Sequence, residues 1–236
     1  MNDLSPFIKL AGYPITERWP ATRPDVLQLY SFPTPNGVKV SIALEEMGLD
    51  YEPHRVTLAE SDVKSDAFLS LNPNNKIPAI IDSDGPDGPI GLFESGAILI
   101  YLAEKSGKLI GTGAKKYETI KWLMFQMGGI GPMFGQLGYF SKFAGAEIED
   151  PRPRERFLTE AKRLLAVLEK ELAGKDWITG EFSIADIAIA PWLRGLEMYG
   201  VREAVGWADH PNLVAYLDRF LARPAVQRGL VIPTRD

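Results

Sequence analysis

The sequence predicts a two-part fold, with an α/β half followed by an all-helical half. Short strand-like runs alternate with helical patterns up to about residue 108. From about Lys115 onward the strand patterns cease, and apolar residues recur at helical spacing. The chain has 236 residues, which is long enough for two modest domains. We therefore expect an N-terminal extension over residues 1–25, an α/β domain over residues 26–108 and an all-helical domain over residues 115–236.

Composition and charge exclude several classes of protein. The chain is 45% hydrophobic and 24% charged, as is usual for a globular protein. Its formal net charge of -5 argues against nucleic acid as a partner. It contains no cysteine, so any thiol chemistry must use the sulfur of a substrate. The isolated His54 and His210 have no metal-ligand spacing, and no metal site is expected.

The first residues lack a basic and then apolar signal-peptide pattern, and no stretch reaches the ~18 uncharged residues of a membrane span. We expect a cytoplasmic protein with no membrane contact. The extension over residues 1–25 is rich in proline and aromatic residues and has no regular period. Polar disordered tails lack such apolar content. Phe7, Tyr13 and Trp19 are therefore expected to pack, for instance on a partner subunit, with a partly ordered tail as an equal alternative.

The α/β half reads as the element order βαβαββα. Residues 27–31 alternate as in a strand, and residues 51–58 form a second strand that Pro53 assigns to a sheet edge. Between them, Thr34 followed by Pro35 is typical of an N-cap and a first helical residue, and Gly48 ends the helix. Residues 62–71 are expected to form a short irregular helix.

Pro78 lies between strand-like apolar residues, where a central strand would exclude a residue without an N–H. A special bond or an open edge is therefore expected. A cis Ile77–Pro78 bond would expose the N–H and C=O of Ile77, which could pair with a short extended peptide. Further on, the strand at residues 90–93 passes into a helix at Glu94 and Ser95. Helix N-termini attract anions, so an anion site is expected beside this edge.

The helical half contains three local signals. Residues 128–132 combine glycines with a proline and are expected to kink or interrupt a helix. Residues 157–172 form the clearest amphipathic helix, with a proline before it and Gly174 after it. Residues 183–186 open another helix with a capping-box variant. A last helix is expected to end before Pro224.

Taken in order, these motifs resemble a known family. The βαβ and ββα units, with Ile-Pro entering the third strand, resemble the thioredoxin-like fold. The Lys-Ile-Pro at residues 76–78, Phe-Glu-Ser-Gly-Ala-Ile at residues 93–98 and Ser-Ile-Ala-Asp at residues 183–186 resemble a glutathione transferase. Thr-Pro-Asn-Gly at residues 34–37 is similar to the bacterial Nu class. The resemblance implies a thioredoxin-like N-terminal domain followed by a helical glutathione-transferase C-terminal domain.

Thr34 and Asn36 are the catalytic residues that this resemblance implies. Thioredoxin-like redox proteins place a Cys-x-x-Cys before this helix, whose dipole stabilises a thiolate. Here the same field would act on the thiol of bound glutathione, with the Thr34 hydroxyl and the Asn36 amide or N–H as donors. Such hydrogen bonds, each worth about 1.5–3 kcal/mol, would lower the thiol pKa enough to ionise it near pH 7. Taken alone, the tetrapeptide also fits an ordinary N-cap and turn.

The resemblance also implies the residues that hold the rest of glutathione. Glu94 would pair with the γ-glutamyl ammonium, and Ser95 with the helix N-terminus would receive its carboxylate. Ile77, followed by Pro78, would bind the cysteinyl backbone by strand-like pairing. A helix cap followed by a solvated face is the alternative for Glu94 and Ser95.

Two further positions concern ligand carboxylates. In the Nu-class pattern a glutamine contacts the glycine end of glutathione, but the equivalent place falls near Val63, which has no polar group. The neighbouring Lys64 is more often solvated surface. Arg156 lies where the class resemblance places an arginine that reaches glutathione from the helical domain. A surface ion pair among neighbouring charges is its alternative.

The resemblance implies a homodimeric enzyme that uses glutathione as co-substrate, most of all to reduce disulfides, with peroxidase or conjugating activity besides. The small electrophilic, disulfide or peroxide substrate should meet an adaptable apolar wall. That wall would consist of Met133, Phe134, Tyr139, Phe140 and Phe143, for which packing in the core is the alternative. The alternatives are a non-catalytic glutathione-binding or structural protein of the same fold, and a dehalogenating or ring-opening transferase.

Overall fold

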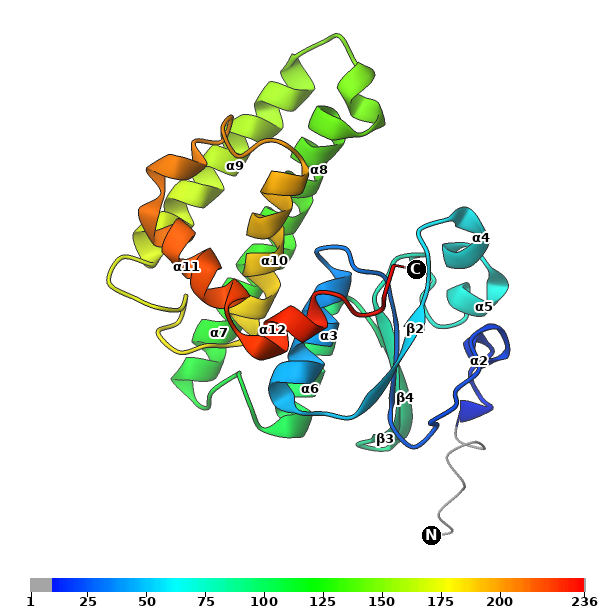
Figure 1. The fold of residues 1–236 in the computed structure, drawn as a ribbon. Helices are drawn as coiled ribbons and strands as arrows, with labels where there is room; N and C mark the ends of the chain where they lie inside the picture. The colour runs from blue at the N-terminus through cyan, green and yellow to red at the C-terminus, as the bar shows by residue number, and fades with distance from the viewer. Residues whose placement is uncertain (1–9, 236) are drawn as a thin grey trace. The chain divides into compact units, whose positions relative to one another are not determined.

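The structure is a computed structural model that describes residues 10–235. These residues form two compact units (Figure 1). The first contains the described residues up to Ser106 together with those from Pro224 onward, and the second is Gly107–Arg223. This division differs from the expected one at its C-terminal end. Helix α12 (Pro224–Gly229) belongs with the first unit because it packs on α3 (Gly37–Met47).

The first unit is built on a four-stranded sheet with the order β2-β1-β3-β4. The strands are β1 (Leu27–Ser31), β2 (Tyr51–Arg55), β3 (Ala79–Gly85) and β4 (Gly88–Phe93). β1 pairs in parallel with β2 and antiparallel with β3, and β3 pairs antiparallel with β4. β2 is an edge strand, so the expected edge position of Pro53 is confirmed. The thioredoxin-like fold class is confirmed with it.

The two faces of this sheet are covered by different elements (Figure 1). Helices α3 and α6 (Ser95–Ser106) pack together on one face. On the other face, β-strand side chains such as Tyr30 and Ile81 join an apolar cluster with residues from the short helices α2 (Ile15–Arg18), α4 (Glu60–Val63) and α5 (Asp66–Leu69). The short irregular helix expected over residues 62–71 is two single turns, because Ser65 caps α5 by accepting from the Phe68 N–H at 3.2 Å.

The described part of the N-terminal extension, residues 10–25, packs on its own unit. Tyr13 and Trp19 lie against the apolar cluster, and the Trp19 indole N–H donates to the Arg55 carbonyl at 3.0 Å. Arg18, on α2, forms an ion pair with Asp62 at 2.6 Å. The expectation that these aromatic residues pack is confirmed for Tyr13 and Trp19, while Phe7 lies outside the described residues.

The second unit is helical throughout. Its elements are α7 (Ala114–Phe125), the π-helical turn η1 (Gln126–Ile130), α8 (Gly131–Lys142), the 3-10 turn η2 (Ala144–Glu147), α9 (Arg152–Glu171), α10 (Ile184–Met198), the 3-10 turn η3 (Trp207–Asp209) and α11 (Pro211–Leu221). The expected break at residues 128–132 is the π-helical turn, through which the chain continues from α7 into α8. Pro132, which has no N–H, follows directly after this turn, where the Gly131 N–H donates to the Gln126 carbonyl five residues back.

A capping box fixes the start of α10, as expected. The Asp186 carboxylate is fully buried and accepts from the backbone N–H groups of Ile178 at 3.0 Å and Ser183 at 2.8 Å. Burial raises the pKa of Asp186 to about 6, and these donors oppose the rise. The carboxylate thus ties the loop before α10 to the first turn of the helix, most of whose residues are buried.

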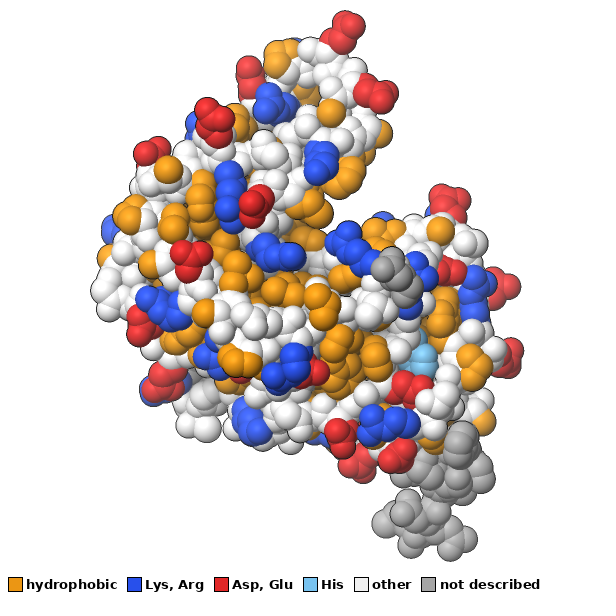
Figure 2. All heavy atoms as spheres, in the orientation of Figure 1, with side chains coloured by type: hydrophobic (Ala, Val, Ile, Leu, Met, Phe, Trp, Pro, Cys, Tyr) orange, Lys and Arg blue, Asp and Glu red, His pale blue; other side chains and the backbone are white. Residues whose placement is uncertain are grey.

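No helix within residues 10–235 is long and apolar enough to cross a membrane. On the face that Figure 2 shows, lysine and arginine side chains are interspersed with aspartate and glutamate.

Candidate functional site

Three segments meet at one end of the sheet of the first unit. Tyr30 in β1 pairs with Ala79 in β3, which pairs in turn with Phe93 in β4. β1 therefore ends where β3 begins and where β4 ends. The loop after β1 carries Thr34 and Asn36, residues 77 and 78 precede β3, and residues 94 and 95 follow β4. The strand register places these three pairs of predicted site residues at the same end of three adjacent strands.

Thr34 lies in the tight connection between β1 and α3. Its Oγ1 accepts from the Gly37 N–H at 3.1 Å, but the helix begins at Gly37 with Asn36 as its N-cap, so the prediction of Thr34 as N-cap and Pro35 as first helical residue is wrong by two residues. A Cβ at Gly37 would lie 1.9 Å from the carbonyl oxygen of Phe32, so only glycine fits. Within residues 10–235 the Thr34 hydroxyl proton has no acceptor. That proton is therefore available to a ligand atom at the N-terminus of α3.

Ile77 presents its backbone while its side chain packs inward. The Ile77–Pro78 bond is cis, and the Ile77 side chain belongs to the apolar cluster. In the part of the chain that the structure describes, the N–H and C=O of Ile77 have no hydrogen-bond partner. The buried Asn72 side chain braces the preceding loop, because it donates to the Lys76 carbonyl and accepts from the Asn74 N–H at 2.9 Å. The predicted peptide-pairing edge is present, and Asn72 is a supporting residue that sequence reasoning missed.

Glu94 and Ser95 have opposite environments. Glu94 is exposed and has a φ of 70°, in the left-handed region that residues other than glycine rarely adopt. Its carbonyl accepts from the Ile98 N–H at 3.0 Å, which starts α6. Ser95 is buried in the first turn of that helix. A strained residue of this kind at a helix start is often found where a ligand binds.

Lys39 is a second residue of this region, besides Asn72, that sequence reasoning missed. Its side chain is fully buried, and its Nζ donates to Ser95 Oγ at 3.2 Å. Burial lowers the pKa of Lys39 to about 7, and the negative charge of Glu94 opposes the fall. The available signal was a lysine inside a helical run whose other members are apolar or small, at residues 37–44.

Comparison with known proteins now gives the family. The model described as the glutathione S-transferase N-terminal domain matches residues 25–104, and the one for the C-terminal domain matches residues 151–219. The disulfide-bond oxidoreductase YfcG of Escherichia coli is 41% identical over 210 residues, which cover 87% of this chain and 95% of YfcG. The chain belongs to the glutathione S-transferase family. The resemblance inferred from its motifs is confirmed.

Two solved structures of this family are very similar to the present glutathione S-transferase. A glutathione transferase from Burkholderia graminis, with two glutathione molecules bound per subunit, is 61% identical with a TM-score of 0.94. The match covers 96% of this chain and 96% of the other. A glutathione transferase from Pseudomonas putida, with one glutathione disulfide bound per subunit, is 58% identical with a TM-score of 0.93. That match covers 95% of this chain and 99% of the other.

The glutathione S-transferase has no polar side chain at the position near Val63. Val63 ends α4 with its side chain in the apolar cluster. The adjacent Lys64 forms an exposed ion pair with Glu60 one helical turn away. Lys64 is therefore the surface residue that its sequence context indicated.

Arg156 belongs to the second unit of the glutathione S-transferase, on α9. It lines a hollow of about 400 Å³ together with residues from α7, η1 and α8, among them Met124 and Met133. The neighbouring Glu160 pairs with Arg163 at 2.7 Å, and Arg152 pairs with Asp150 at 2.5 Å. Within residues 10–235 Arg156 has no ion pair closer than 4.0 Å, although its charge, after that of Arg163, helps to lower the pKa of Glu160.

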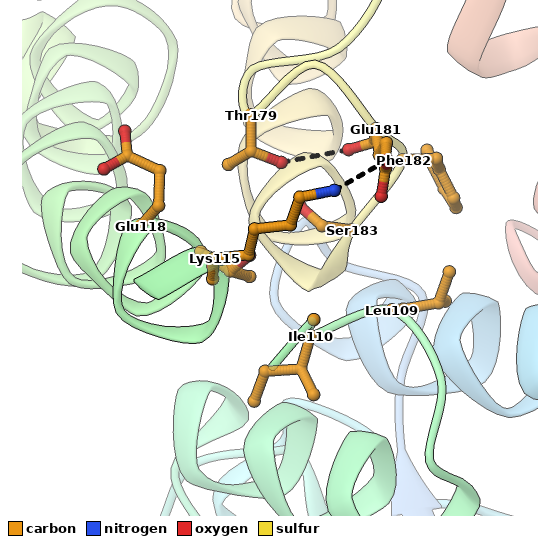
Figure 3. Close-up of a pocket in the computed structure, with 10 residues that line it drawn as sticks. Leu109, Ile110, Lys115, Glu118, Thr179, Glu181, Phe182 and Ser183 are labelled. Carbon is orange, nitrogen blue, oxygen red and sulfur yellow. Dashed lines mark hydrogen bonds and ion pairs between the residues drawn. The ribbon is translucent and has the colours of Figure 1, made fainter. Parts of the chain in front are cut away.

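The apolar wall expected from α8 is only partly surface. Phe134 is fully buried, so its assignment to that wall is wrong: it faces the core of the helical unit. Tyr139 and Phe143 are exposed, and Phe140 stacks on Phe157 with ring centroids 5.6 Å apart. A second pocket in the same unit, of about 120 Å³, lies beside the capping box (Figure 3). Lys115 and Glu181 form a 3.0 Å ion pair at it, and no predicted site residue lines it.

The histidines of this glutathione S-transferase have structural surroundings. His54 is buried, stacks on Tyr30 and forms a 2.7 Å hydrogen bond with Gln28. Burial lowers its pKa, and the negative charge of Glu52 opposes the fall. His210 precedes α11. Within residues 10–235 no three histidine or carboxylate side chains gather as metal ligands would.

Proposed function

We propose that this glutathione S-transferase family member is an enzyme that activates the thiolate of glutathione and reduces disulfides with it. The observation that carries the proposal is the meeting, at one end of the sheet, of three segments that match the γ-glutamyl, cysteinyl backbone and thiol parts of glutathione. The chain supplies no cysteine of its own. Support also comes from the glutathione and glutathione disulfide bound by the two related structures, and from the activity that names YfcG.

The γ-glutamyl end and the cysteinyl backbone are held by two segments. The exposed Glu94 carboxylate pairs with the ammonium of glutathione, and Ser95 with the N-terminus of α6 receives the carboxylate. The unpaired N–H and C=O of Ile77, ahead of Pro78, form strand-like hydrogen bonds with the cysteinyl residue. This arrangement directs the thiol toward the loop after β1.

Thr34 and Asn36 activate the sulfur. The Thr34 hydroxyl keeps its proton for the ligand because its oxygen already accepts from the Gly37 N–H. Donation to sulfur, with the field of the α3 N-terminus, favours thiolate over thiol. Asn36, in the same turn, adds its amide or N–H as a second donor.

The reaction needs two glutathione molecules. The thiolate of the bound glutathione attacks one sulfur of the substrate disulfide, so a mixed disulfide forms and the other substrate sulfur leaves as a thiolate that takes up a proton. The thiolate of a second glutathione then attacks the glutathione sulfur of the mixed disulfide. This step releases glutathione disulfide and the second substrate thiol. The substrate disulfide gains two electrons, which the two glutathiones lose.

Arg156 is proposed to bind a ligand carboxylate. Its guanidinium is exposed in a hollow and has no ion pair within residues 10–235, which leaves its planar donor face available. We further propose membership of the Nu class, a homodimer and a cytoplasmic location. The exposed apolar Tyr117 and Met124 on α7 support a subunit contact, which light scattering after size-exclusion chromatography tests.

The first test is binding and turnover. Millimolar glutathione should raise the unfolding temperature, because a ligand that binds the native state stabilises it. The enzyme should then reduce a small symmetric disulfide faster than it conjugates an aryl halide. Stabilisation without any turnover would establish the non-catalytic alternative. Conjugation or dehalogenation that is faster than disulfide reduction would establish a dehalogenating or ring-opening transferase.

Replacing Thr34 tests the donor. Thr34→Ala should lower disulfide turnover at least about tenfold, the size expected for the loss of one hydrogen bond to a charged group. Thr34→Ser should restore most of the rate, since it keeps the hydroxyl. Thr159→Ala, at an exposed position on α9, is the matched control. Equal rates for Thr34→Ala and the parent enzyme would remove Thr34 from the mechanism.

A further inference from the structure

Lys39 lies buried behind the segment that holds the γ-glutamyl end in the proposed function. It occupies the first turn of α3, and its side chain is 0% exposed. Lysine is almost never fully buried unless its charge is compensated, because an ammonium loses its hydration on burial. The Nζ contacts Ser95 Oγ at 3.2 Å across 56 positions of sequence. A costly group is thus placed directly behind a predicted ligand contact.

The hydrogen-bond roles in this contact follow from chemistry. When Lys39 is charged, its ammonium has donors and no acceptor, so Ser95 Oγ accepts from Lys39. A serine hydroxyl that accepts in this way uses its own hydrogen as a donor. Ser95 is therefore oriented to donate, as a ligand carboxylate at the N-terminus of α6 requires.

The charges around Lys39 make its response to a ligand distinctive. From the α6 side the Glu94 carboxylate acts on it, while Lys105, near the other end of α6, is paired with Asp82 at 2.9 Å. On α12, which also packs on α3, Arg228 is paired with Glu45 at 2.6 Å. From β1, Tyr30 packs with its ring in the apolar cluster on the opposite face of the sheet. Among these charged groups, Glu94 is the one whose charge raises the pKa of Lys39.

We propose that Lys39 is a positioning residue, which orients the Ser95 hydroxyl and places a buried positive charge behind the α6 N-terminus, and so selects ligands whose end bears an α-carboxylate. The inference rests on the proposed function. Glu94 outside and Lys39 inside form a charge pair of the opposite polarity to the ammonium and carboxylate of a γ-glutamyl group. The same pair disfavours a thiol peptide that lacks the carboxylate.

This role couples ligand binding to protonation of Lys39. Burial lowers the pKa of Lys39 to about 7, so at pH 8 about one tenth of the free protein carries the charge. A ligand carboxylate against Ser95 favours the charged ammonium and draws in a proton. S-Methylglutathione is the suitable probe, since it has no thiol proton to release.

The test is isothermal titration calorimetry of S-methylglutathione at pH 8, in buffers with different enthalpies of ionisation. The parent protein should take up most of one proton per ligand bound. Lys39→Met should bind at least about tenfold more weakly, by the loss of a charge-assisted hydrogen bond, and take up no proton at this site. Lys121→Met, an exposed lysine paired with Glu118 on α7, is the matched control and should behave as the parent.

A second ligand isolates the carboxylate. The analogue of S-methylglutathione without the γ-glutamyl α-carboxylate should bind the parent at least about tenfold more weakly than S-methylglutathione, and Lys39→Met should bind the two equally. Uptake that persists in Lys39→Met belongs to the ligand ammonium and is subtracted. If Lys39→Met fails to fold, the parent is titrated with both ligands: the analogue keeps the ammonium but lacks the carboxylate, so the proton uptake should fall when the analogue replaces S-methylglutathione, and equal uptake with the two ligands would overturn the inference.

When Lys39→Met folds, two results would overturn the inference. One is binding by the parent without Lys39-dependent proton uptake, and the other is the same discrimination between the two ligands in Lys39→Met as in the parent. Either leaves the proposed function intact, because glutathione still binds. Absence of binding by the parent would overturn the proposed function and this inference together.

Discussion

Glu94 combines strain with a proposed binding role. Its φ of 70° is costly for a residue with a Cβ, by about 1–2 kcal/mol. Its carboxylate is exposed, so it contributes little packing in return. The strained conformation of Glu94 destabilises the fold. Its presence at the start of a helix is explained by the ligand ammonium that Glu94 is proposed to bind.

Glu94→Gly should therefore separate stability from function. The variant should gain about 1 kcal/mol in free energy of unfolding, because glycine adopts this conformation without strain. Its affinity for glutathione should fall at least about tenfold with the loss of the ion pair. Urea denaturation and ligand titration measure the two effects. Glu94→Gln, which keeps the strain, should lose affinity without gaining stability, and destabilisation of the glycine variant would count against this account.

The buried Lys39 should make stability depend on pH in a definite direction. Its pKa is about 7 in the folded protein and near 10.4 in an unfolded chain. Between these values the unfolded chain binds more protons, so stability rises with pH across that window. The cost of the buried charge is fully present below pH 7 and is gone near pH 10.

Lys39→Met removes this dependence. Relative to the parent, the variant should be most stable below pH 7, and its advantage should shrink by roughly 1 kcal/mol per pH unit between about pH 7.5 and 9.5. Urea denaturation of both proteins at pH 6, 7.5 and 9 measures the difference. A difference that stays constant across this range would mean that Lys39 keeps an ordinary pKa in the folded protein.

At the scale of elements, α3 and α10 are anchored in different ways. α3 is held at its start by the Thr34 hydroxyl, and Gly229 of α12 packs directly on its middle, where an added Cβ would lie 2.6 Å from the Ile42 Cα. α10 instead depends on a local device, the carboxylate of Asp186 in the capping box. Long-range packing therefore supports the proposed site, while a local motif supports the helical unit.

Replacement of Asp186 by alanine should destabilise the second unit. The change leaves the Ile178 and Ser183 N–H groups without their buried acceptor, at about 1–3 kcal/mol for each buried donor. We expect a loss of about 2–4 kcal/mol in the free energy of unfolding, measured by urea denaturation with circular dichroism. Asp209→Ala, at an exposed position in η3, should have little effect. A loss below about 1 kcal/mol for Asp186→Ala would show that water replaces the carboxylate.

For the whole molecule, the first unit is discontinuous in sequence, since the segment from Pro224 returns to it after the helical unit. The Ser41 hydroxyl donates to the Gly229 carbonyl at 2.6 Å, and Arg235 donates to the Pro33 carbonyl at 3.3 Å. The returning segment therefore contacts both the middle of α3 and the loop that carries Thr34.

A chain ended after Arg223 should lose stability in its first unit. It lacks the buried Val226 and the packing of Gly229, so we expect at least about 3 kcal/mol less free energy of unfolding for that unit. Urea unfolding should then split into two transitions, and glutathione should no longer shift the earlier one. Val231→Ser, at an exposed position in the same segment, is the control. A single transition at the parent's midpoint would exclude this role of the returning segment.

The parts of the fold and of the candidate site that the sequence predicts correctly are those with a signal within a few residues. β1 has the predicted bounds because alternation marks it, and the capping box was found because its partners are three residues apart. Thr34, Ile77 and Glu94 each gave a separate signal, but only the strand register puts them together. Lys39 could not be assigned because its partner Ser95 is 56 residues away. The assignment of α12 to the first unit likewise depends on its packing against Ile42, which no local sequence pattern indicates.

The return of α12 to the first unit also sets an order on biosynthesis. A ribosome makes the strands and α3 first, and it completes the entire helical unit before Pro224–Gly229 is translated. Until then the face of α3 at Ile42 lacks its cover, and the nascent chain offers that apolar surface to chaperones. Helix α3 is thus translated before the helical unit and yet is among the last elements to reach its final packing.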